Sequence, residues 1–259
     1  MEPIDVLDPN SALESVILNT SEIVELEMDV TRNDTNGRII WTTLVNVFVP
    51  YSVMIFSSII AYDLLLSLGQ TKDITSELSF VISGIIFFLI VIHRYSITMG
   101  IEKLYSSFSL EKLTLAVILP MSIIIVVDFL GSIPLGIIAD ILFPSGMEQI
   151  TIYDDSSLTN PVYLSLLFIT IVIIAPITEE LAFRGLILDY LNHNYGKWPA
   201  IIVSSILFGV IHIIPAAIVV ATFGGLLYGW LRIKTDSLWP GILCHSLWNS
   251  FVFVMMFLI

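Results

Sequence analysis

Six polar side chains in the last third of the chain have residue types and spacings that catalysis could use. The preceding run, "YLSLLFITIVII", is as apolar as a membrane helix. An ionised side chain in hydrocarbon costs roughly 3 kcal/mol or more, so such a group needs either a partner or a task. The segments "EELAFR", "FGVIH" and "HSLWN" supply the six residues, which are Glu179, Glu180, Arg184, His212, His245 and Asn249.

Helical spacing separates the two glutamates. Residues four apart share a helix face, so Glu180 and Arg184 can pair, and the acid-first order is the favourable one. Glu179 points about 100° away from that pair. A buried ion pair that only fixes helix packing would explain Glu180 and Arg184, but it leaves Glu179 without a partner.

The candidate partners for Glu179 are two histidines and an asparagine. Either histidine alone is more often a packing residue than a catalyst. A carboxylate beside an imidazole can orient a water molecule and accept its proton, and we assign this role to Glu179 with His212. A second imidazole and an amide can donate hydrogen bonds to an oxyanion, which suits His245 with Asn249. Together these residues predict peptide hydrolysis within a membrane.

The composition predicts an all-α, polytopic bundle of transmembrane helices. The chain has 259 residues, of which 56% are hydrophobic and only 13% charged, too apolar for an ordinary soluble domain. The stretch 131–143 is too short to span alone, so it either extends the third helix or forms an eighth piece. We therefore expect seven to eight membrane segments, seven of them near 41–68, 79–99, 113–130, 161–190, 198–213, 217–232 and 239–259.

The fourth of these helices must be unusually long. A rise of about 1.5 Å per residue from Lys197 puts His212 some 20 Å deep, whereas Glu179 lies only about ten residues before the same membrane edge. The two side chains can meet only if the fourth helix is long, tilted or extended beyond the bilayer.

The charges divide the chain and orient it. Residues 1–38 are expected to form a flexible acidic arm, and 39–259 the transmembrane domain. About half of the net charge of -13 lies in the arm, so the membrane part is only mildly acidic and nucleic acid is not an expected partner. Lysine and arginine are more frequent in cytoplasmic loops, which indicates a cytoplasmic N-terminus. In that orientation Lys72 is the single basic residue of the outer loops, and the basic residues of the inner segments are Arg32, Arg38, Arg94, Lys103, Lys112, Lys197, Arg232 and Lys234.

The three motifs, in this order on successive apolar helices, resemble the CPBP family of intramembrane proteases. That family includes type II CAAX prenyl endopeptidases and bacteriocin-processing or immunity-type relatives, and the resemblance covers residues 115–259. It implies cleavage of a prenylated or other membrane-associated peptide or protein, in a cavity open to the cytosol and to membrane lipid. It also implies catalytic roles for Glu179, His212, His245 and Asn249, supported by Glu180 and Arg184.

Several alternatives stay open. The family is commonly labelled metalloprotease, and a glutamate with two histidines is a set that zinc accepts. The chain has no HExxH pair, however, and a glutamate-dependent mechanism uses Asn249 and requires no cofactor, so we favour it with zinc as the alternative. Cys244 is expected to be inert packing. A catalytically silent immunity or scaffold protein is the main rival, and a transporter is a weaker one because no inverted repeat relates the two halves.

Overall fold

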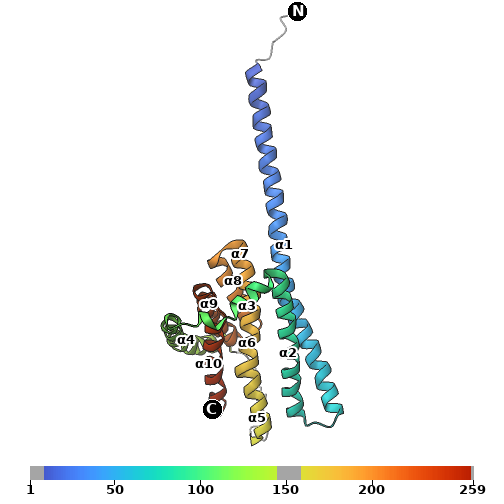
Figure 1. Cartoon of the computed structure of the whole chain (residues 1–259), viewed down its shortest axis with the longest axis vertical. Coiled ribbons are helices and arrows are strands. Elements are labelled where there is room, and N and C mark those ends of the chain that lie inside the picture. Colours follow the sequence, from blue (N-terminus) through green and yellow to red (C-terminus); the bar gives the residue numbers. More distant parts are fainter. Residues whose placement is uncertain (1–8, 145–158, 258–259) are drawn as a thin grey trace, which may run out of the picture. The chain divides into compact units, whose positions relative to one another are not determined.

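The computed structural model describes residues 9–144 and 159–257, and all regular structure within them is helical (Figure 1). This confirms the all-α prediction. In chain order the elements are α1 (Pro9–Ser67), α2 (Lys72–Met99), α3 (Ile101–Ser107), η1 (Leu110–Lys112), α4 (Leu115–Leu142), α5 (Pro161–Phe168), η3 (Ile169–Ile174), α6 (Ala175–Glu180), η4 (Leu181–Ile187), α7 (Leu188–Tyr195), α8 (Lys197–Val210), α9 (Pro215–Thr235) and α10 (Trp239–Met255).

Five helical stretches are long and apolar enough to cross a membrane. The segments predicted near 198–213 and 239–259 correspond to α8 and α10, which have only 14 and 17 residues. A 14-residue helix rises about 21 Å, less than the roughly 30 Å of a hydrocarbon core. The number of crossings therefore stays a prediction, with five candidates at Thr35–Ser67, Lys72–Met99, Leu115–Leu142, Pro161–Tyr195 and Pro215–Thr235.

Two helices are longer than predicted. Helix α1 begins at Pro9, so the described part of the acidic arm is helical. Helix α4 continues through the stretch 131–143, which is the first of the two alternatives expected for that stretch, although Pro120 and Pro134 lie inside it. Apolar surroundings favour this outcome, because a helix satisfies its backbone groups internally where water cannot. The chain forms two compact units, Met1–Leu44 and Val45–Ile259.

The fourth predicted helix is a single helical run from Pro161 to Tyr195. At 35 residues it would extend about 50 Å, which confirms the expectation of an unusually long helix. It starts at a cap in which Asn160 accepts hydrogen bonds from two backbone N–H groups, and it stops before Gly196, whose φ is 82°. Two stretches, η3 and η4, have π-helical hydrogen bonding, which is often found at functional sites.

The core lies around η4, α8, α9 and α10. Helix α9 packs against α8, α4 and α10, and α10 also packs against η3 and α6. Every residue of η4 is buried, whereas α4 exposes large apolar side chains along its length. In the second unit, η4 thus lies in the interior, whereas the apolar surface of α4 faces outward where lipid would lie.

Candidate active site

The first element of the site is the ion pair predicted from helical spacing. Nη1 of Arg184 lies 3.1 Å from Oε1 of Glu180, and the two side chains are 1% and 0% exposed. The pair is confirmed, although the angle at Nη1 is too poor for a regular hydrogen bond. The guanidinium carbon also lies 4.2 Å from the centre of the Phe208 ring. The cation is thus stabilised by one carboxylate and one aromatic face.

His245 connects the two neighbouring glutamates. Its Nδ1 lies 3.2 Å from Oε1 of Glu180, and its Nε2 lies 3.8 Å from Oε2 of Glu179. Because an ionised carboxylate only accepts hydrogen bonds, Nδ1 carries the ring proton and donates a hydrogen bond to Glu180. Nε2 is therefore the nitrogen directed at Glu179. The Glu179 side chain is 22% exposed while that of Glu180 is fully buried, so only Glu179 can reach a water molecule.

His212 lies in the turn after α8, not within a helix as predicted. The helix ends at Val210 because Ile213 has a φ of 63° and Ile214 precedes a proline, a position that disfavours helical backbone. Nδ1 of His212 lies 2.9 Å from the backbone oxygen of Phe208. A carbonyl oxygen can only accept, so Nδ1 donates, and Nε2 is left for another partner.

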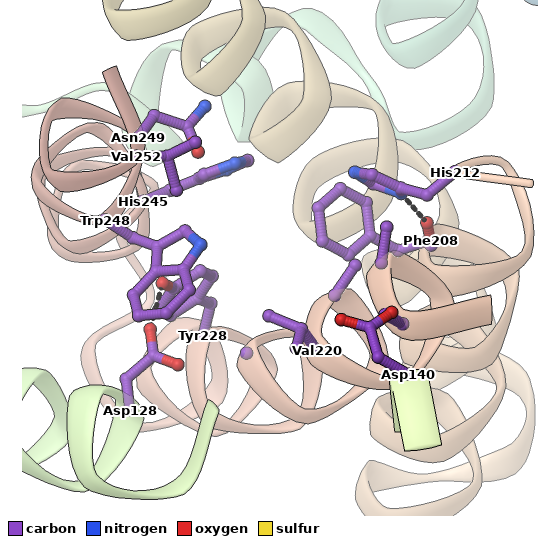
Figure 2. A pocket seen from close by; sticks show the side chains of 14 residues that line it. Asp128, Asp140, Phe208, His212, Val220, Tyr228, His245, Trp248, Asn249 and Val252 are labelled. Carbon is purple, nitrogen blue, oxygen red and sulfur yellow. Dashed lines mark hydrogen bonds between the residues drawn. The ribbon is translucent and has the colours of Figure 1, made fainter. Parts of the chain in front are cut away.

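His212, His245 and Asn249 line one cavity of about 560 Å³. Figure 2 shows His212 on one side of it and His245 with Asn249 on the other. The expected pairing of Glu179 with His212 does not appear among the hydrogen bonds and ion pairs of residues 9–144 and 159–257, because His245 is the imidazole beside Glu179. Nδ2 of Asn249 donates to the backbone oxygen of Ile171 at 2.9 Å. One amide hydrogen is thus used to fix the side chain.

Three residues of the site were missed in the sequence. The Phe208 ring packs edge-on against the rings of His212 and His245, with centroids 5.0 and 5.6 Å away. The Tyr228 ring stacks on His245, and its hydroxyl donates to Asp128. Asp128 had a signal, because the cost of an ionised group in hydrocarbon applies to "IIIVVDFLG" as it does to the glutamates. Tyr228 had none.

The described residues hold no group of three or more His, Cys, Asp or Glu side chains that could bind a metal ion. His212 and His245 lie on opposite sides of the cavity, and Glu180 is engaged by Arg184. The zinc set considered from the sequence does not fit this arrangement. No step below is therefore assigned to a metal.

Comparison with known proteins agrees with the motifs. Residues 161–251 match the model of the family described as type II CAAX prenyl endopeptidase Rce1-like. This segment is similar to that family. The matched stretch contains all six polar residues, so the resemblance predicted from the three motifs is confirmed.

One curated relative is similar over nearly the same length. "Putative membrane peptidase YdiL" of Bacillus subtilis (strain 168) is 31% identical over 90 residues, which is 35% of this chain and 37% of that protein. The similarity thus spans little more than a third of either protein. No solved structure shows a significant match.

Proposed function

We propose that the chain is an intramembrane endopeptidase of CAAX type, which hydrolyses a peptide bond in a membrane-anchored, prenylated or otherwise membrane-associated substrate. The observation that carries the proposal is the position of His245 between two adjacent glutamates, one buried and paired and one partly exposed. The Rce1-like match over 161–251 and the name of the Bacillus relative, a membrane peptidase, support peptide-bond hydrolysis as the reaction class.

Glu179 is the general base in this mechanism. A water molecule hydrogen-bonded to Glu179 and to Nε2 of His245 gives its proton to the carboxylate as its oxygen attacks the substrate carbonyl carbon. The proton then passes to the leaving amide nitrogen, and the carbon–nitrogen bond breaks. The products are a new carboxylate and a free amine, and the enzyme returns to its starting state.

Asn249 and His212 take part through the substrate. The second amide hydrogen of Asn249 is our candidate donor to the oxyanion that forms on the attacked carbonyl. Nε2 of His212, free of the contact with Phe208, is an acceptor for a peptide N–H of the substrate. His212 therefore acts from the cavity wall opposite His245 rather than as the direct partner of Glu179.

The setting of the proposed enzyme is the lipid bilayer. Five candidate spans and the large exposed apolar side chains of α4 support an integral membrane protein. The bias of lysine and arginine supports a cytoplasmic N-terminus and a cavity open to the cytoplasmic side. A lipid-anchored substrate would keep its anchor in hydrocarbon while its peptide enters the cavity.

The test is cleavage by purified protein in detergent. A farnesylated CAAX peptide and its unprenylated counterpart are incubated with wild type, Glu179→Ala and the surface control Glu102→Ala, and mass spectrometry identifies the bond cut. We expect Glu179→Ala to lose at least about 100-fold in rate and Glu102→Ala to match wild type. A Glu179→Ala protein that still cleaves would overturn the proposal and favour a different activation of the nucleophile. A wild-type protein that cleaves neither peptide would favour a silent scaffold.

A chelator arm separates the two mechanisms. Because no step uses a metal, cleavage should persist in 1,10-phenanthroline. Loss of cleavage with chelator and its return with added zinc would replace the glutamate-only mechanism by a metal-dependent one.

A further inference from the structure

A buried carboxylate that the proposed mechanism does not use lies beside the site. Asp128 on α4 is 3% exposed, inside a helix long and apolar enough to span a membrane. Within the described parts of the chain its hydrogen-bond partners are two hydroxyl groups, Tyr228 Oη and Ser132 Oγ, the latter at 2.7 Å, and no lysine or arginine pairs with it. A buried carboxylate without a cation is costly, so a fold that keeps one indicates that the group has a task.

The two hydroxyl groups fix both oxygens of this carboxylate. Ser132 donates to Oδ1 and Tyr228 donates to Oδ2, and both donors are almost fully buried, at 1% and 2% exposure. Ser132 follows Asp128 by one helical turn on α4, whereas Tyr228 lies on α9. The carboxylate therefore holds the Tyr228 hydroxyl in one place relative to α4.

The Tyr228 ring transmits this placement to His245. The two rings are stacked, with centroids 5.7 Å apart and planes 26° apart. On the other side, the edge of Phe208 packs against the same imidazole at 5.6 Å. Figure 2 shows Asp128, Tyr228 and His245 on one wall of the cavity. A rotation of the His245 ring would have to push Tyr228 away from Asp128.

The orientation of that ring matters for the reaction. Nδ1 must face Glu180 for Nε2 to face Glu179, because the two nitrogens lie on different edges of one rigid ring. If the ring rotates, the residues of the site are unchanged, but Nε2 no longer faces Glu179 and the water bound there.

We propose that Tyr228, tethered by Asp128, is a positioning residue that sets the plane and tautomer of His245. This inference rests on the proposed function for its catalytic consequence, but the placement of the ring can be measured without any activity. Neither Tyr228 nor Asp128 contacts the reacting atoms in this scheme. In the proposal their effect passes through the imidazole that Tyr228 stacks on.

The experiment uses the full chain in detergent or nanodiscs with ¹⁵N-labelled histidine. The His245 signals are assigned with His245→Gln, and the tautomer is read in wild type, Tyr228→Phe, Asp128→Asn, the double variant and the control Tyr105→Phe, whose side chain is exposed. We expect a single Nδ1–H tautomer in wild type and in the control. Tyr228→Phe and Asp128→Asn should each shift the signals or populate a second tautomer.

Kinetics supply the second measurement. Each single variant should lower kcat by about tenfold with little change in KM, since both substitutions nearly keep the size of the side chain and mainly disturb the orientation of His245. The double variant should be no worse than either single one, because both substitutions weaken the same contact between Tyr228 and Asp128. Thermal unfolding verifies that the variants are folded, and Tyr228→Phe keeps the ring if larger changes prevent folding.

The two proposals fail in different ways. Unchanged His245 signals in both single variants would overturn the positioning role, whatever the rates show. Additive losses of kcat would also overturn it, because they require two independent effects. Retained cleavage by Glu179→Ala would instead overturn the proposed function, and the nuclear magnetic resonance result would still decide how the ring is held.

Discussion

Oε1 of Glu180 lies 3.2 Å from Nδ1 of His245, and the same oxygen lies 3.1 Å from Nη1 of Arg184. This oxygen of Glu180 therefore contacts both the Arg184 guanidinium on the same helical run and the His245 imidazole on α10. The neighbouring residue, Glu179, is left to face the more open side. In the proposed mechanism, the consecutive glutamates of "EELAFR" thus have different tasks, one structural and one directed at chemistry.

This division predicts opposite effects for the two amide substitutions. Glu180→Gln leaves the Arg184 guanidinium buried without a counter-charge, so it should lower the free energy of unfolding by about 3–5 kcal/mol. Glu179→Gln removes a partly exposed carboxylate and should change stability by less than about 1 kcal/mol while abolishing cleavage. Thermal unfolding in detergent, run beside the peptide assay, measures both. Equal destabilisation by the two variants would contradict the division.

Sequence reasoning succeeded where local spacing decides the outcome. The Glu180–Arg184 pair follows from a four-residue separation, and it survives although Arg184 lies in a π-helical stretch. The partner of Glu179 could not be predicted in this way, because it depends on how α10 and the turn after α8 approach the long helix. Tertiary packing puts His245 there, and the left-handed backbone at Ile213 turns the chain near His212.

The same limit explains the residues that were missed. Tyr228 is an ordinary aromatic residue in an apolar helix until its neighbours are known. Asp128 could have been flagged by its surroundings and paired with Ser132 by their four-residue spacing, but its second partner, Tyr228, lies on another helix and could not be predicted from spacing. Phe208 belongs to "FGVIH", yet only the fold reveals that it touches an arginine and two histidines.

A methyl group at Gly241 should disable the site although no polar residue is replaced. A Cβ built there would lie 2.7 Å from Oε2 of Glu180, closer than real Cβ contacts, so the carboxylate would have to move. Gly241→Ala is expected to reduce cleavage by at least about tenfold. A displaced Glu180 would also shift His245, and a small displacement of a catalytic group is costly. Gly136→Ala is the matched control, since its nearest contact would be 3.4 Å from Val220. Equal activity of the two variants would mean that the position of Glu180 is not critical.

A second buried ion pair should dominate stability rather than catalysis. Arg232 contacts Asp189 and donates to Ser107 at 2.6 Å, and Tyr95 also donates to Asp189. Asp189→Asn removes the buried counter-charge of Arg232, which is 2% exposed, and leaves only the exposed carboxylate of Asp236 at 3.8 Å. The substitution should cost about 3–5 kcal/mol. The variant should keep its rate per folded molecule, because the cluster does not contact the catalytic residues through their side chains.

The control for this prediction is the double variant Asp189→Asn with Arg232→Met. Removing both charges eliminates the unpaired buried cation, so the double variant should be more stable than Asp189→Asn alone. Denaturation curves for the two variants and wild type measure the difference. A double variant that is less stable than Asp189→Asn would show that Arg232 stabilises the fold mainly through its other contacts.

Asp236, just beyond the end of α9, gives a prediction for pH. Burial alone would raise the pKa of its carboxyl group, but hydrogen bonds from Lys103 and Lys112 and the nearby Arg232 outweigh burial and lower the pKa. A depressed pKa means that the contribution to stability is complete above the unfolded-state pKa, about 3.9, and is lost as pH falls through the lower folded-state value. The side chain is 53% exposed, so this contribution should stay below about 1 kcal/mol. Unfolding temperatures of wild type and Asp236→Asn should therefore differ near neutral pH and converge towards pH 3. A gap that stays constant down to that pH would mean that the charge of Asp236 is not what joins α3 and η1 to the end of α9.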